Sequence, residues 1–232
     1  MIQADLIIEG AAELLTLQGH SARPRRGEEM RDLRIIRQGA LAARRGKIVW
    51  VGTTADLLTS VRPVAFAKLI DAYGKTVMPG LVDPHTHLVF AGSRENEFAM
   101  RIQGKTYQEI AAAGGGINAT VAATRKASPK ELKAAARKSL ARMLALGTTT
   151  VEAKSGYGLE LTTELKMLEV IRELNEEGPM TVIPTFMGAH EIPSEYRHDP
   201  EAYVDLVITR MIPEIANRKL ARFCDVFCET DR

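Results

Sequence analysis

The sequence predicts an α/β protein in two parts, a small β-rich unit over residues 1–79 and a parallel sheet with covering helices over residues 80–232. Before residue 80, short β-like runs alternate with turn residues and end at Pro79-Gly80, a strong stop signal for secondary structure. After residue 80, predicted strands alternate with predicted helices. That alternation implies right-handed βαβ units, which build a parallel sheet.

Four short strands are expected in the first unit. Gly46 lies between two of them and indicates the turn of a hairpin or meander. Residues 20–34 mix acidic with basic side chains, so we interpret them as a solvated loop rather than an anion-binding arm. The expected strands are residues 6–9, 39–43, 47–51 and 69–77.

Three helices and four strands are expected in the second unit. Ser128 is the predicted N-cap of the first helix, Glu131 completes its capping box, and Gly147 ends it. Asp199 is the predicted cap of the third helix, which Pro213 should kink or end. The expected helices are residues 129–146, 163–176 and from about 200; the expected strands are 81–82, 148–153, 180–186 and 221–228.

The composition excludes several classes of protein. With 31 basic and 29 acidic residues the formal net charge is +2, which is not typical of a nucleic-acid-binding protein. No leader pattern begins the chain, and no apolar run approaches the roughly 18 residues of a membrane span. We therefore expect a soluble, cytoplasmic protein with no nucleic-acid or membrane partner. Cys224 and Cys228 are expected to be reduced core thiols, because residues four apart in a strand lie roughly 13 Å apart, too far for a disulfide.

The candidate site begins with His85 and His87 in the segment PGLVDPHTH, at the end of a predicted strand. Side chains two residues apart in a strand point to the same side, and two neutral imidazoles on one side can begin a zinc or iron site. An H-x-H pair alone is common, and two unrelated surface histidines are the simpler interpretation. The preceding apolar strand, the Pro-Gly break and the adjacent Asp83 favour a metal site.

PGLVDPHTH resembles the first-strand motif of the amidohydrolase superfamily, whose members combine a (β/α)8 TIM barrel with a small β-sandwich. Four further segments narrow the resemblance to the imidazolonepropionase family. They are HTHLVFAGSRENEF, the run Gly114-Gly115-Gly116-Ile117, KSGYGL (154–159) and TFMGAHEIP (185–193). The resemblance implies a partial barrel of about four strands over residues 80–232. Residues 1–79 would then be the N-terminal part of a composite β-sandwich.

The resemblance also implies a reaction and the residues that serve it. The reaction is hydrolysis of the cyclic amide of 4-imidazolone-5-propanoate to N-formimidoyl-L-glutamate, a step of histidine degradation. By the family pattern His85 and His87 bind one zinc or iron ion, while Arg94, Tyr157 and His190 contact this small-molecule substrate. A guanidinium can grip the propionate bidentately, and an imidazole can donate to the ring carbonyl or a ring nitrogen.

Simpler interpretations exist for each of the three substrate residues. Arg94 could be a surface ion-pair partner of Glu95 or Glu97, Tyr157 an ordinary loop aromatic, and His190 a hydrogen-bonded loop histidine. The glycine run lacks a following Lys-Ser/Thr, which excludes a phosphate-binding loop of that type.

Further metal ligands and the acid–base residues are expected beyond Arg232, so the 232 residues alone are expected to be an inactive half barrel. In that half barrel Leu81, Val82, Val151, Val182 and Val226 would face inward, where strands are missing. Two other functions stay open, namely another deaminase or cyclic amidohydrolase of the superfamily, and a non-catalytic α/β module. The oligomeric state is also open, with a homodimer among the alternatives.

Overall fold

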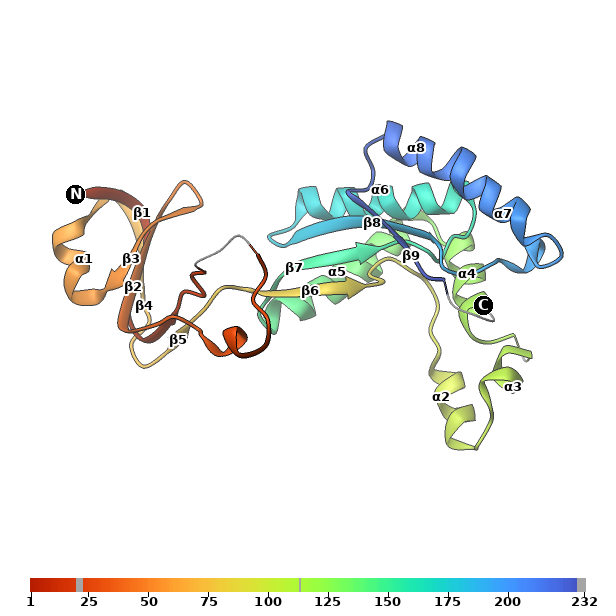
Figure 1. Cartoon of the computed structure of the whole chain (residues 1–232), viewed down its shortest axis with the longest axis horizontal. Coiled ribbons are helices and arrows are strands. Elements are labelled where there is room, and N and C mark those ends of the chain that lie inside the picture. The colour runs from red at the N-terminus through yellow and green to blue at the C-terminus, as the bar shows by residue number, and fades with distance from the viewer. Residues whose placement is uncertain (20–22, 113, 229–232) are drawn as a thin grey trace. The chain divides into compact units, whose positions relative to one another are not determined.

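The computed structural model describes residues 1–19, 23–112 and 114–228 of the chain, shown in Figure 1. The chain divides into two compact units, Met1–Pro79 and Gly80–Arg232. Among the described residues, none of the helices combines the length and hydrophobicity needed to cross a membrane.

Unit 1 is a mixed five-stranded sheet with one helix. The strand order is β3-β2-β1-β4, and β5 also pairs with β1. The antiparallel pairing of β2 with β3 confirms the predicted hairpin. Helix α1 (Thr54–Ser60) was not predicted; its N-cap is Thr53, whose side chain accepts a hydrogen bond from the Asp56 N–H. The strands are β1 (Ile2–Leu15), β2 (Ile35–Arg44), β3 (Lys47–Thr53), β4 (Val61–Asp71) and β5 (Thr76–Val77).

The other predictions for unit 1 are confirmed with two changes. Each predicted strand is found, but the one expected over residues 69–77 is interrupted, since β4 ends at Asp71 and β5 begins at Thr76. The loop predicted over residues 20–34 contains a short 3-10 turn, η1 (Gly27–Arg31), in which no residue is buried. Residues 20–22 of that loop lie outside the described residues.

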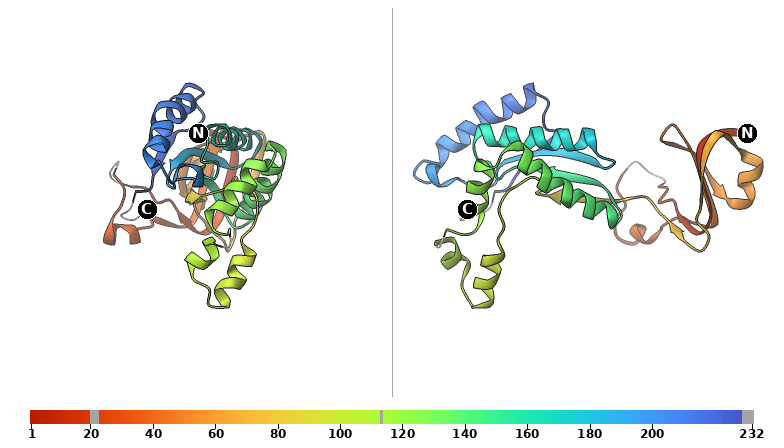
Figure 2. Two further views of the ribbon diagram at one scale, coloured as in Figure 1. Left: turned by 90° about the vertical axis from the view of Figure 1, so that its right-hand side faces the viewer. Right: turned by 180° about the vertical axis from the view of Figure 1, so that it is seen from behind.

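Unit 2 is built on a curled parallel sheet with the order β6-β7-β8-β9. All three strand pairs are parallel, which confirms the predicted parallel sheet. Figures 1 and 2 show helices α5, α6 and α7–α8 over one face of this sheet. The strands are β6 (Leu81–Thr86), β7 (Thr148–Lys154), β8 (Thr181–Ala189) and β9 (Phe223–Val226).

The long helices of unit 2 begin and end close to the predicted residues. Helix α5 (Pro129–Ala145) has the predicted capping box: the Ser128 hydroxyl accepts from the Glu131 N–H, and the Glu131 carboxylate accepts from the Ser128 N–H. Gly147, two residues past the end of α5, has a φ of +96°, a conformation that favours glycine. Helix α6 covers Leu161–Glu177.

The third predicted helix is interrupted, as Pro213 predicts. The N-cap of helix α7 (Pro200–Leu206) is Asp199, whose side chain accepts a hydrogen bond from the Ala202 N–H. A π-helical turn, η3 (Val207–Met211), then separates it from α8 (Ile212–Asn217). A proline ring collides with the preceding helical turn and donates no hydrogen bond, and a wider turn relieves both problems.

Three short helices between β6 and α5 were not predicted. They are α2 (Glu95–Ile102), α3 (Tyr107–Ala112) and α4 (Ile117–Lys126), and α2 and α3 extend away from the sheet in Figure 1. The N-cap of α2 is Arg94 and that of α4 is Gly116, and neither makes a side-chain cap hydrogen bond. Without a Ser, Thr, Asp or Asn at the start, a helix this short has little sequence signature.

The core of unit 2 lies between the sheet and the helices. Val151 and Val182 are 0% and 1% exposed and belong to the same buried cluster as Leu168 and Ile171 of α6. The prediction that both valines face inward is therefore wrong, because a two-residue period turns them toward the helices. Val82 and Val226 lie in the two outermost strands and are exposed.

The two cysteines are free, as predicted, but the prediction that they lie in the core is wrong. Cys224 and Cys228 are both exposed. Cys224 belongs to β9, which pairs with β8 along one side only, and Cys228 follows the end of that strand. In the described part of the chain, no second neighbouring strand covers β9.

The capping box of α5 gives a direct test of the fold. Replacing Ser128 with Ala should lower the free energy of unfolding by about 1 kcal/mol, because the Glu131 N–H loses its acceptor. Ser128→Asp keeps an acceptor oxygen and serves as the control. Urea denaturation of the three proteins measures the difference, and an equal loss in both variants would show that the cap does not stabilise α5.

Candidate metal and substrate site

The two histidines of the H-x-H motif lie at the C-terminal end of β6. His85 is the penultimate residue of the strand and His87 follows its last residue. Their ring centroids are 5.8 Å apart. The Thr86 hydroxyl between them donates a 2.8 Å hydrogen bond to the Glu152 carbonyl, which fastens the end of β6 to β7.

The environment of His87 keeps its imidazole neutral. Burial, followed by the neighbouring charges of His190 and His85, lowers the pKa of His87 to about 4. Its Nδ1 is buried and has no hydrogen-bond partner among the described residues. A neutral imidazole with a vacant ring nitrogen fits the needs of a divalent metal ion, which binds unprotonated histidine. No group of three or more His, Cys, Asp or Glu side chains in the described residues is arranged to hold a metal ion.

Tyr157 lies in the loop that follows β7 and stacks on His87. The two ring centroids are 4.5 Å apart, and the planes meet at 30°. The neighbouring Gly156 has a φ of +104°, and a Cβ atom there would lie 2.7 Å from the Met187 carbonyl oxygen. Only glycine fits at position 156, and the resulting loop conformation holds the Tyr157 ring beside His87.

The guanidinium of Arg94 is held in place through its Nε atom. Its Nε donates a 2.9 Å hydrogen bond to the hydroxyl of Thr120, which is 5% exposed. Its Cζ lies 5.9 Å from the centre of the Tyr157 ring, within the range of a cation–π contact. Within the described residues Arg94 forms no ion pair with Glu95 or Glu97, and Glu97 instead accepts a hydrogen bond from the Gly116 N–H. The surface-ion-pair interpretation therefore does not match the structure.

His190 follows β8 and hydrogen-bonds to the backbone. Its Nδ1 lies 2.7 Å from the Met187 carbonyl oxygen. A carbonyl can only accept, so we assign the hydrogen to Nδ1, which makes Nε2 an acceptor in the neutral ring. The His190 ring centroid lies 6.0 Å from that of His87 and 6.4 Å from that of Tyr157.

All five predicted site residues line one hollow in unit 2, with a volume of about 310 Å³. A larger hollow of about 580 Å³, between α5 and α6, is mainly apolar and contains none of the histidines. The smaller hollow combines polar and aromatic groups from several elements, as a small-molecule site requires. It is lined by His85, His87, Arg94, Tyr157 and His190, together with Ile117, Met187, Glu191 and Phe227.

A charged cluster within the sheet was not predicted. Lys154, with a side chain 5% exposed, places its Nζ 2.6 Å from Glu152 Oε1 and 2.7 Å from Asp225 Oδ2. The Thr185 hydroxyl donates to the same Glu152 oxygen. Burial alone would raise the pKa of Glu152, but the hydrogen bonds from Lys154 and Thr185 outweigh it and lower this pKa. The hydrogen bond from Lys154 also lowers the pKa of Asp225.

This cluster joins β7, β8 and β9 on the face of the sheet that the helices do not cover. The sequence signal for it is the pair Glu152 and Lys154, two residues apart in an otherwise uncharged strand. The Glu152 carboxylate accepts hydrogen bonds from both Lys154 and Thr185.

Replacing Lys154 with Met should destabilise the protein in a pH-dependent way. The expected loss near pH 7 is about 2 kcal/mol, less than for a fully buried pair because the Asp225 side chain is 39% exposed. Glu152 and Asp225 have folded-state pKa values below their unfolded values of about 4. Their stabilisation is therefore complete above about pH 5 and is lost as the pH falls through the folded values.

Urea midpoints measured from pH 7 down to pH 3 test this prediction. The difference between the wild type and Lys154→Met should shrink as the pH falls. Lys130→Met, which removes an exposed lysine of α5, is the control for the charge change. A difference that stays constant over this range would show that the lysine does not stabilise the two carboxylates.

Comparison with known proteins gives a consistent result. Residues 68–124, which contain His85, His87 and Arg94, match the Amidohydrolase family. The chain is 51% identical over 228 residues to an imidazolonepropionase of Alkaliphilus metalliredigens, covering 98% of this chain and 54% of that protein. It is 55% identical over 230 residues to an imidazolonepropionase of Symbiobacterium thermophilum, covering 99% of this chain and 53% of that protein. The chain thus spans about half the length of these curated relatives.

Among solved structures, the fold is similar to that of a 5-methylcytosine deaminase from Klebsiella pneumoniae. The TM-score is 0.53 at 17% sequence identity, covering 96% of this chain and 51% of that chain. This likeness concerns the fold alone, and it agrees with the parallel sheet of unit 2. In sequence, over nearly its whole length, this chain resembles the N-terminal portion of the imidazolonepropionases.

Proposed function

We propose that the protein carrying this chain is a metal-dependent hydrolase that opens the cyclic amide of 4-imidazolone-5-propanoate to give N-formimidoyl-L-glutamate. The observation that carries the proposal is the composition of the 310 Å³ hollow. Three histidines, of which His87 is kept neutral by its low pKa, meet the Arg94 guanidinium there, as a metal-assisted reaction on a carboxylate-bearing ring requires. The sequence identity of 51% and 55% to two curated imidazolonepropionases supports the same reaction.

His85 and His87 would hold one divalent ion, zinc or iron. The buried Nδ1 of His87 without a hydrogen-bond partner among the described residues supports this assignment. The low pKa of His87 means that protons do not compete with a metal near neutral pH. When bound, such an ion supplies the electrophilic activation that hydrolysis of a cyclic amide needs.

Arg94 would bind the propionate of the substrate. Thr120 holds its Nε, so the two Nη groups can face a carboxylate in the hollow. Tyr157, stacked on His87 and adjacent to Arg94, lies between the metal end and the carboxylate end of the hollow.

His190 would bind the ring of the substrate. Because its Nδ1 hydrogen is directed to the Met187 carbonyl, its neutral form offers an acceptor at Nε2. We therefore assign it a ring N–H group of the substrate. This assignment differs from donation to the ring carbonyl, which the sequence left open.

We also propose an assignment for the two units. Four parallel strands in chain order, with His85 and His87 at the C-terminal end of the first, support the first half of a (β/α)8 barrel in residues 80–232. The sheet of residues 1–79 would be the N-terminal part of a composite β-sandwich.

A substrate assay on the metal-loaded full-length protein tests the reaction. The expected result is loss of imidazolone propionate with formation of formimidoylglutamate and no release of ammonia. Ammonia release would favour a deaminase of the same superfamily. Absence of turnover in a protein shown to contain metal would disprove the proposed reaction.

The double variant His85→Ala/His87→Ala should lose the metal, because two of its ligands are gone. Elemental analysis of the purified full-length protein measures the stoichiometry. His198→Ala, which removes an exposed histidine outside the hollow, should retain the wild-type metal content. An unchanged metal content in the double variant would rule out the two histidines as ligands.

Arg94→Met should weaken substrate binding by about 2–5 kcal/mol if the charge pair with the propionate is desolvated. The change should raise KM more than it lowers kcat, since the carboxylate is distant from the reacting bond. Arg101→Met, on helix α2, which begins directly after Arg94, lies outside the hollow and is the matched control. Equal values of kcat/KM for the two variants would mean that Arg94 does not contact substrate.

A further inference from the structure

The loop that presents Tyr157 is organised by a buried carboxylate. Glu164, on α6, is 0% exposed. Its oxygens accept backbone hydrogen bonds from Gly156 at 3.0 and 3.1 Å, from Gly158 at 2.8 Å and from Leu159 at 3.0 Å. These contacts replace the water that a buried carboxylate loses. The N–H side of the loop is therefore fixed by a negative charge.

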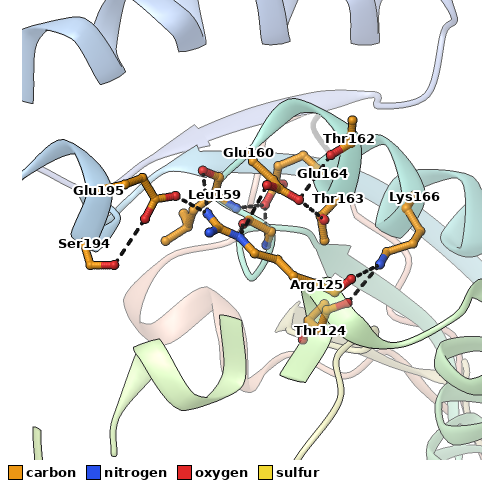
Figure 3. A network of polar contacts seen from close by, with 11 residues as sticks. Thr124, Arg125, Leu159, Glu160, Thr162, Thr163, Glu164, Lys166, Ser194 and Glu195 are labelled. Atoms are coloured by element: carbon orange, nitrogen blue, oxygen red, sulfur yellow. Dashed lines mark hydrogen bonds and ion pairs between the residues drawn. The ribbon is translucent and has the colours of Figure 1, made fainter. Parts of the chain in front are cut away.

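A guanidinium fixes the carbonyl side of the same loop. Arg125, on α4, donates from Nε to the Gly158 carbonyl at 2.7 Å and from Nη2 to the Leu159 carbonyl at 3.2 Å. Figure 3 shows Arg125 and Glu164 beside this loop. Residues 158 and 159 thus donate to an anion through their N–H groups and accept from a cation through their carbonyls.

Arg125 also reaches the segment that follows His190. Its Nη2 lies 2.7 Å from Glu195 Oε1, in the 3-10 turn η2 (Ser194–Tyr196). The Arg125 side chain is 25% exposed and that of Glu195 43%. One planar guanidinium therefore links the loop of Tyr157 to the segment just past His190, as Figure 3 shows for Leu159 and Glu195.

The helix that carries Arg125 also supports the third substrate group. Thr120, which holds Arg94, lies on α4 five residues before Arg125. The C-terminal end of α4 is bound to α6 through Lys166, whose Nζ donates to the carbonyls of Thr124, Arg125 and Ala127. A helix fixed in this way can set the mutual positions of groups that come from three separate loops.

We propose that Arg125 is a positioning residue of the site, which sets Tyr157 and His190 at the distance needed to bind one substrate between them. This inference rests on the proposed function, in which both residues contact substrate. It depends on the fork geometry of arginine. Lysine keeps the charge but offers donors from a single point, so it cannot serve two carbonyls and Glu195 in the same plane.

Kinetics of the full-length protein with imidazolone propionate give the first test. Arg125→Ala and Arg125→Lys should each lower kcat/KM by about 10- to 100-fold, since small displacements of positioning groups have effects of that order. Added guanidinium ion should restore part of the activity of Arg125→Ala, which a general loss of stability would not allow. Arg137→Met on α5 also removes an arginine and its ion pair with Glu177, and it should stay within twofold of wild type.

A double-mutant cycle shows whether Arg125 acts through Tyr157. In a Tyr157→Phe background, the further loss from Arg125→Lys should be clearly smaller than in the wild type, because the two residues share one function. Full additivity of the two losses, or an Arg125→Lys variant as active as Arg137→Met, would overturn the proposal.

Hydrogen exchange tests the inference independently of the reaction. The peptide that contains residues 155–160 should exchange its amide hydrogens at least tenfold faster in Arg125→Ala than in the wild type, and at the wild-type rate in Arg137→Met. If the wild type does not turn over imidazolone propionate, the proposed function is wrong, and this measurement still tests whether Arg125 orders the loop that presents Tyr157. Unchanged exchange in Arg125→Ala would disprove the positioning role of Arg125.

Discussion

Alternate side chains of β7 and β8 pack against the helices of unit 2, and this contact determines which groups can reach the site. Val151 of β7 and Val182 of β8 are buried beneath α6 and its neighbours. The residues next to each valine along its own strand therefore lie on the opposite face of the sheet. Parallel strands also end at one common edge. The groups that follow β6, β7 and β8 therefore meet there, which brings His87, Tyr157 and His190 within 6.4 Å of one another by ring centroid.

The face of the sheet opposite the helices carries Lys154, Glu152 and Asp225, and the lysine pairs with both carboxylates. Lys154 neutralises two carboxylates from separate strands, so neither is left as an isolated buried charge. The same lysine contributes to the low pKa of His87, after burial and the charges of the other two histidines. An imidazole kept neutral by its surroundings is available to a metal ion without first losing a proton.

Local signals in the sequence predicted the elements that depend on local physics. The capping box at Ser128 and the cap at Asp199 concern residues within one turn, and both are found. The sequence did not predict which face of the sheet Val151 lies on, because parallel strands covered by helices need not alternate strictly between apolar and polar residues. The role of Arg125 was also out of reach, since its partners lie 33 to 70 residues away in the chain. The resemblance to the imidazolonepropionase family implied that His85, Arg94 and the others share one site, but no local signal in the sequence predicted that they line one hollow.

The two ends of the hollow differ in how they are built. The imidazoles belong to the end of a strand, where hydrogen bonds to β7 hold the backbone rigidly. Arg94 belongs to the helical segment between β6 and α5, and it is ordered through one hydrogen bond to Thr120. Ordering a long side chain on binding costs about 0.5–1.5 kcal/mol, so an arginine already fixed at Nε binds a carboxylate at a smaller entropic cost. In the proposed function, recognition of the substrate's acidic end would depend on α4, and the chemistry at the ring would depend on the sheet. A change in the helical segment would then alter which acid is bound and leave the metal-binding histidines intact.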